Sequence, residues 1–189
     1  EDTIWVTGVG QHQMWAAQYL SFERPRSFVT TGGLGTMGFG LGASIGAALA
    51  TGKHVVMVTG DGSFAMNMAE LITAVDHHIP VTIVLVNNGV LGMVRQMQSL
   101  FMRQRYSSTT LDRRVDYVAL TKATGAEARR ATTPEELDAA LAWALATDGP
   151  ALIECPIDKD EFVTPVLQIG ASMDELIVNM DDVQARMGR

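Results

Sequence analysis

The stretch VTIVLVNN, residues 81–88, is apolar almost throughout until two asparagines end it. A short run of β-branched residues without polar alternation predicts a strand buried on both faces, as in the middle of a parallel sheet. Similar short runs recur on either side, separated by stretches with helical periodicity. We therefore expect strands near 4–7, 28–30, 54–59, 81–87, 126–128 and 152–157. This alternation predicts an α/β fold: a doubly wound, mainly parallel sheet of about six strands with helices on both faces.

Two of the intervening stretches carry clear helix signals. Thr133 is a good N-cap, and Pro134 and Glu136 follow at positions that the first turn of a helix favours. Between the third and fourth expected strands, apolar residues at helical spacing predict one amphipathic helix with a buried face, formed by Phe64, Met68, Leu71, Ile72 and Val75. After residue 157 the apolar spacing loosens into a tail that ends in a short helical patch near 174–180.

The chain has 189 residues, of which 47% are hydrophobic, and a formal net charge of −7. This length suits one domain, expected at 1–157, with a tail at 158–189 that packs on or near the functional site. The negative charge argues against nucleic acid or an anionic membrane as a partner. A solvated face or a protein contact is then the expected role of an arginine cluster: Arg95, Arg103, Arg105, Arg113 and Arg114.

The compartment is indicated by two further features. A single cysteine, Cys155, and the lack of a targeting or membrane-spanning segment favour a reducing, cytoplasmic location. The chain starts at Glu1 directly before an expected strand, which suggests a piece of a longer protein. Targeting to an organelle therefore stays open.

A glycine-rich segment follows the second expected strand. Gly33, Gly35 and Gly38 spell G-x-G-x-x-G between a strand and a helix, which is the setting of a dinucleotide-binding turn. Asp61 could then serve as the acidic residue that binds a ribose. A nicotinamide- or flavin-binding module is therefore one interpretation of this sequence.

The neighbours of Asp61 favour a different interpretation. Asp61 lies in Gly60-Asp61-Gly62-Ser63 at the end of one strand, and Asn88 ends the next. A carboxylate and an amide from the carboxyl ends of neighbouring strands suit a divalent cation such as Mg²⁺, which commonly keeps phosphate oxygens in its shell. The glycines allow a tight turn, and Ser63 with the helix N-terminus offers donors to a diphosphate.

These motifs resemble those of a known family. The GDG at 60–62 followed by the NN at 87–88 is similar to the motif that binds thiamine diphosphate. Four further stretches, at 8–15, 32–40, 92–96 and 98–101, resemble the C-terminal domain of the large subunit of acetolactate synthase, also called acetohydroxyacid synthase. The resemblance runs from about Thr3 to Val178, nearly the whole chain but only about the last third of the family's polypeptide.

The resemblance implies ligands for the cation and the diphosphate. Mg²⁺ would bind Asp61, Asn88 and the backbone carbonyl of Val90. The diphosphate would be lined by Val9, Gly10, Gln11, His12, Gly62 and Ser63, and Gly60 would also belong to the cofactor-binding residues. For His12, a purely structural hydrogen-bonding role is an equally strong interpretation.

The resemblance also implies contacts for the rest of the cofactor and for the substrate. Gly35 and Met93 would meet the pyrimidine, and Met37 would support the cofactor in its bent form. Met97 would join Met37 in the substrate pocket. The family usually has Trp at position 97, so the preference for the second substrate stays open. Two other departures are Gly42, where Pro is common, and Gln168-Ile169-Gly170, where Pro-Pro-Gly is typical.

The activity implied is the decarboxylation of pyruvate and the condensation of its product with pyruvate or 2-oxobutanoate, in branched-chain amino-acid biosynthesis. The resemblance also implies a homodimer or larger homo-oligomer, and an activating glutamate that lies in another domain and is absent from this chain. It leaves open whether the whole enzyme binds FAD outside this chain and whether it uses a regulatory subunit. Another thiamine diphosphate enzyme, a 2-oxo acid decarboxylase or oxidase, is the nearest alternative.

Overall fold

The computed structural model describes residues 3–111 and 115–188. Its centre is one sheet of six strands in the order β2-β1-β3-β4-β6-β5, and every pairing is parallel. The expected α/β fold is thereby confirmed, with β4 in the interior of the sheet. The strands are β1 (Ile4–Thr7), β2 (Phe28–Val29), β3 (Val55–Gly60), β4 (Val81–Asn87), β5 (Glu127–Arg130) and β6 (Ala151–Pro156).

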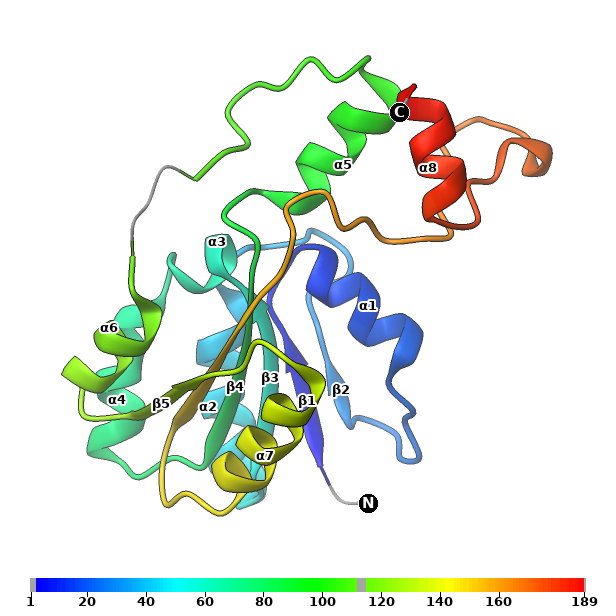
Figure 1. Cartoon of the computed structure of the whole chain (residues 1–189). Coiled ribbons are helices and arrows are strands. Elements are labelled where there is room, and N and C mark those ends of the chain that lie inside the picture. Colours follow the sequence, from blue (N-terminus) through cyan, green and yellow to red (C-terminus); the bar gives the residue numbers. More distant parts are fainter. Residues whose placement is uncertain (1–2, 112–114, 189) are drawn as a thin grey trace.

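Helices cover both faces of this sheet (Figure 1). One face carries α2 (Phe39–Thr51), α4 (Leu71–Asp76) and α6 (Tyr117–Ala123), and the other carries α1 (Gln11–Tyr19) and α7 (Pro134–Leu145). This division follows from right-handed crossovers, because the chain reverses its direction of travel across the sheet after β2 and again after β5. Beyond the strands lie α5 (Gly92–Phe101), the 3₁₀ turn η2 (Met173–Glu175) and α8 (Met180–Met187).

The main core is a row of apolar side chains that crosses five strands in register. Val6, Met57, Ile83, Leu152 and Ala128 are successive partners in the ladder, so their side chains share one face of the sheet. All five are buried. They pack against α2, α4 and α6 in one cluster.

The second face is packed by small residues of α7. Ala140 and Ala144 are buried against Ala151 and Ile153 of β6. The helix begins as expected, because the Thr133 side chain accepts a hydrogen bond from the backbone N–H of Glu136 at 3.2 Å. The predicted N-cap is therefore confirmed.

The single amphipathic helix expected over 64–75 is wrong. The chain forms α3 (Asp61–Phe64), then the 3₁₀ turn η1 (Met68–Glu70), then α4. At Met66 and Asn67 the backbone N–H groups bond three residues back instead of four, which overwinds the chain. The face of α4 is turned as a result, so Leu71 is fully buried whereas Ile72 is 53% exposed.

The tail packs on α5 through a second apolar cluster, here called the tail cluster: Leu100, Phe162, Val166, Ile177, Val183 and Met187. The helix expected near 174–180 is misplaced, because that segment holds only the turn η2 and α8 begins at Met180. Asn179 caps α8 by accepting from the backbone N–H of Asp182 at 3.0 Å. Asp182 reciprocates, because its Oδ2 accepts from the backbone N–H of Asn179 at 3.3 Å.

Substitutions of Ile83 and Ile72 test two features of the fold: the row of core side chains across the sheet, and the helix break before α4. Ile83→Ala should lower the free energy of unfolding by about 2 to 5 kcal/mol, because it leaves a cavity in the central strand. Ile72→Ala should change it by less than about 0.5 kcal/mol, because that side chain is largely exposed. Urea denaturation of both variants measures the difference. Equal losses would contradict the break between η1 and α4.

Candidate functional site

The carboxyl ends of β1, β3 and β4 are neighbours, and a cavity of about 240 Å³ opens beside them. Parallel α/β sheets bind ligands at this edge. The cavity is lined by every predicted site residue except Met97: Val9, Gly10, Gln11, His12, Gly35, Met37, Gly60, Asp61, Gly62, Ser63, Asn88, Val90 and Met93. The sequence therefore identified residues that lie together, although their individual roles stay predictions.

The two glycines of the GDG turn lie where neighbouring side chains leave no room for a Cβ atom. A Cβ at Gly60 would lie 2.7 Å from Nδ1 of His12, and a Cβ at Gly62 would lie 2.9 Å from Cδ2 of Leu91. His12 is buried among its neighbours, whereas Leu91 lies in the cavity wall and can move only into the cavity. Any larger residue at 60 or 62 would push side chains into the space that a ligand needs.

Ser63 ties the loops around the cavity together. Its Oγ accepts hydrogen bonds from the backbone N–H of Val9 at 3.2 Å and of Gly38 at 3.1 Å. Val9 follows β1, Gly38 precedes α2, and Ser63 lies in α3 after β3. One hydroxyl oxygen thus fixes the spacing of three loops that line or border the site.

His12 is a neutral side chain at the cavity edge. Burial lowers the pKa of His12 from 6.5 to about 4, and the residue is only 5% exposed. Its Nε2 is buried and has no hydrogen-bond partner among the residues described. The ring is therefore neutral at pH 7 in the protein without a ligand. Both roles that the sequence left open for His12, structural and diphosphate-lining, therefore stay predictions.

The turn at 87–90 presents two of the predicted cation ligands. Oδ1 of Asn87 accepts from the N–H of Gly89 at 3.2 Å, and Oδ1 of Asn88 accepts from the N–H of Val90 at 3.1 Å. Asn87 is held in turn by Glu154, whose Oε1 accepts from Asn87 Nδ2 at 2.8 Å. The turn is thereby anchored to the neighbouring strand β6.

Glu154 supports this turn from outside the cavity lining, and the sequence reasoning missed it. It is 3% exposed, and its Oε2 is paired with Nε and Nη2 of Arg130, both at 2.9 Å. Burying a carboxylate without such partners would be costly. An acidic residue inside the apolar run ALIECP, beside the strand that ends in two asparagines, was the available signal.

Asp61 is the acidic residue of the cavity. It is 4% exposed at the start of α3, and the hydroxyl of Tyr117 donates to its backbone carbonyl at 3.3 Å. Among the described residues no cluster of three His, Cys, Asp or Glu could hold a metal ion. A cation here would therefore use the Asp61 carboxylate with amide and carbonyl oxygens, which is the oxygen set that Mg²⁺ accepts. The donor set fits the ion.

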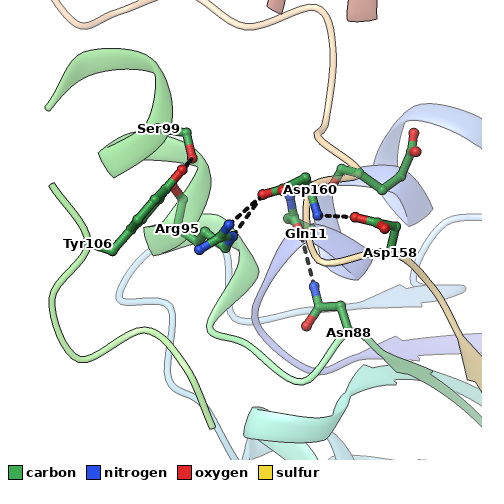
Figure 2. Close-up of polar contacts among 8 residues, drawn as sticks. Gln11, Asn88, Arg95, Ser99, Tyr106, Asp158 and Asp160 are labelled. Carbon is green, nitrogen blue, oxygen red and sulfur yellow. Dashed lines mark hydrogen bonds and ion pairs between the residues drawn. The ribbon is translucent and has the colours of Figure 1, made fainter. Parts of the chain in front are cut away.

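Met97 lies on α5 outside the cavity lining and packs against the tail cluster. Arg95, two residues before it, corrects the expectation of a solvated arginine face. It is 7% exposed, and its Nε and Nη2 donate to Oδ1 of Asp160 at 2.9 and 2.7 Å (Figure 2). Arg103 and Arg105 are exposed, as expected, whereas Arg113 and Arg114 lie outside the described residues.

Comparison with known proteins identifies the family. Residues 8–155 match the family described as thiamine pyrophosphate enzyme, C-terminal TPP binding domain. The chain belongs to this family. It is thus a binding domain for thiamine diphosphate, as the cofactor is also called, and the dinucleotide interpretation of its glycine-rich segment is set aside.

Several relatives of this thiamine diphosphate-binding domain are larger proteins. It is 47% identical over 177 residues to the large subunit of acetolactate synthase isozyme 2 of Escherichia coli, covering 93% of this chain and 32% of that protein. It is 46% identical to the mitochondrial acetolactate synthase catalytic subunit of Saccharomyces cerevisiae, covering 92% and 25%, and 45% identical to an acetolactate synthase of Mycobacterium bovis, covering 93% and 29%. The domain thus spans a third or less of these relatives. In its described part, no helix has the length and apolar character to cross a membrane.

The buried state of His12 makes stability depend on pH. The unfolded chain binds this proton near pH 6.5 and the folded domain only near pH 4, so the unfolded state is favoured as pH falls through this window. The contribution of neutral His12 to the free energy of unfolding should be fully present above about pH 6.5. It should fall by about 3 kcal/mol as the pH is lowered toward 4. Urea unfolding across pH, compared with His12→Gln, measures the contribution. An identical pH slope in both proteins would contradict a neutral His12.

Proposed function

We propose that this chain is the domain of an acetolactate synthase that binds the diphosphate of thiamine diphosphate together with Mg²⁺. The observation that carries the proposal is the single cavity that gathers the GDG turn, the NN turn and the glycine-rich segment. The relatives named acetolactate synthase, at 42–47% identity, support the choice of enzyme. The whole enzyme would decarboxylate pyruvate and join the product to pyruvate or 2-oxobutanoate.

Each part of the cavity has a role in this proposal. Asp61, Asn88 and the carbonyl of Val90 would hold Mg²⁺, which would bridge to the diphosphate. The backbone around Gly10 and Gly62 would approach the diphosphate closely. When bound, thiamine diphosphate supplies the electron sink for decarboxylation, while the protein orients the cofactor and substrates and excludes water. Met37, Met93 and Val90 offer the apolar wall that such exclusion needs.

The remaining parts of the enzyme are proposals about the protein beyond this chain. As the resemblance to acetolactate synthase implies, the activating glutamate would come from another domain. Exposed apolar side chains such as Leu34, 91% exposed beside Gly35, support association with another domain or a second copy. Relatives named large or catalytic subunit support a regulatory partner.

Removing the carboxylate of Asp61 tests the cation site. Asp61→Asn should abolish the Mg²⁺ dependence of thiamine diphosphate binding, because Asp61 is the only formal negative charge assigned to the ion. Calorimetry with and without Mg²⁺ measures this, and circular dichroism checks the fold. Asp138→Asn, an exposed change on α7, is the control. Cofactor binding by Asp61→Asn equal to that of the control would refute the assignment.

Met97 is the test of the substrate assignment. A thioether lacks the rigid ring face of an indole, so discrimination between pyruvate and 2-oxobutanoate as second substrate should be weak. Met97→Trp in the whole enzyme should shift the product ratio by a graded amount, about 10- to 200-fold at most. A competition assay with both acids measures the ratio. An unchanged ratio would exclude position 97 as a determinant and leave it as a tail contact.

A further inference from the structure

Side-chain amides form a continuous relay from the backbone of the tail to the turn at 87–90. Nε2 of Gln96 donates to the carbonyl of Val163 at 2.8 Å, and the N–H of Val163 donates to Oε1 of Gln96 at 2.9 Å. Nε2 of Gln11 donates to that same Oε1 at 2.9 Å and to the carbonyl of Glu161 at 3.0 Å. Oε1 of Gln11 then accepts from Nδ2 of Asn88 at 3.1 Å (Figure 2).

The backbone of the tail fixes the direction of this relay. A backbone N–H can only donate and a backbone carbonyl can only accept, whereas a side-chain amide can turn either end to a neighbour. Only one orientation of Gln96 satisfies both groups of Val163. The carbonyl of Glu161 and Oε1 of Gln96 both require a donor, so Gln11 must present Nε2 to them. Oε1 of Gln11 then faces Asn88 and can only accept, so Asn88 must donate from Nδ2.

Gln11 and the N–H of Val90 together fix which atom of Asn88 faces the turn, since each is compatible with only one orientation of the amide. With Nδ2 committed to Gln11, Oδ1 points to the opposite side, where it accepts from the N–H of Val90. Of the two ends of the amide, only the oxygen can ligate Mg²⁺. We infer that Gln96 is a positioning residue: through Gln11 it holds Asn88 Oδ1 toward the cation, so docking of segment 161–163 sets the affinity for Mg²⁺. This inference rests on the proposed function.

Two of the amides in the relay are shielded from water. Gln11 is 3% and Gln96 is 1% exposed, so water does not replace a lost bond without rearrangement. A Cβ at Gly92 would lie 2.6 Å from Nδ2 of Asn88 and would overlap Oε1 of Gln11. The glycine at the start of α5 is therefore what allows the two amides to meet. The ion pair of Arg95 with Asp160 secures the same tail segment one residue before Glu161.

A matched pair of glutamines on α5 provides the variants. Gln98 makes the same two bonds as Gln96, donating to the carbonyl of Ser107 at 3.2 Å and accepting from its N–H at 3.0 Å, but its partner lies in another loop. Gln96→Met and Gln98→Met each keep the length of the side chain and remove both polar ends without adding charge. Only the first interrupts the relay.

The experiment is a Mg²⁺ titration of thiamine diphosphate binding by calorimetry in the intact protein. Gln96→Met should need about 10- to 100-fold more Mg²⁺ for half-maximal binding, the usual effect of removing a group that orients a metal ligand. Its affinity for the cofactor at saturating Mg²⁺ should stay close to wild type. Gln98→Met should match wild type in both quantities. Equal Mg²⁺ requirements in the two variants would overturn the inference.

Hydrogen exchange in the unmodified protein gives a second test that needs no variant. Coupling is reciprocal, so Mg²⁺ with thiamine diphosphate should slow exchange at the amide of Val163. Unchanged exchange there, with binding intact, would overturn the inference and leave the proposed function standing. Failure of the unmodified protein to bind the cofactor in a Mg²⁺-dependent way would instead overturn the proposed function, and the inference with it.

Discussion

The site depends on one constraint: β1, β3 and β4 are adjacent and run in the same direction. In a parallel sheet all carboxyl ends open on one edge, so residues that follow these strands meet without any long loop. The in-register row from Val6 through Ile83 to Leu152 holds the strands at fixed height. A shift in that register would bury the wrong side chains and also displace the GDG turn from the NN turn.

The parts of the fold that the sequence predicted are those in which local chemistry and burial agree. Strands such as 81–87 are apolar because both faces are covered, and their ends carry the polar residues of the site. The break before α4 was not predictable from the spacing of apolar residues. That spacing does not show that the N–H groups of Met66 and Asn67 bond three residues back instead of four. One overwound turn was enough to expose Ile72.

The contacts around the site that the sequence did not predict have one cause in common: they join residues that are far apart in the sequence. Glu154 pairs with Arg130 and Asn87 at separations of 24 and 67 residues, and Arg95 pairs with Asp160 at a separation of 65. Charge patterning along the sequence assigns Arg95 to the surface, because isolated charges are rarely buried. Only the folded chain shows the partner that makes burial tolerable. Likewise the contact of Gln11 with Glu161 spans 150 residues, beyond the reach of any local pattern.

The hydroxyl of Ser63 has a consequence for the order of folding. It joins Val9, 54 residues away, and Gly38, 25 residues away, so the bonds form only after distant segments have closed large loops. A partly folded chain in which only β3 and β4 have paired would contain both motifs yet would lack a finished cavity. Ligands would then bind the native state alone and draw the folding equilibrium toward it by mass action.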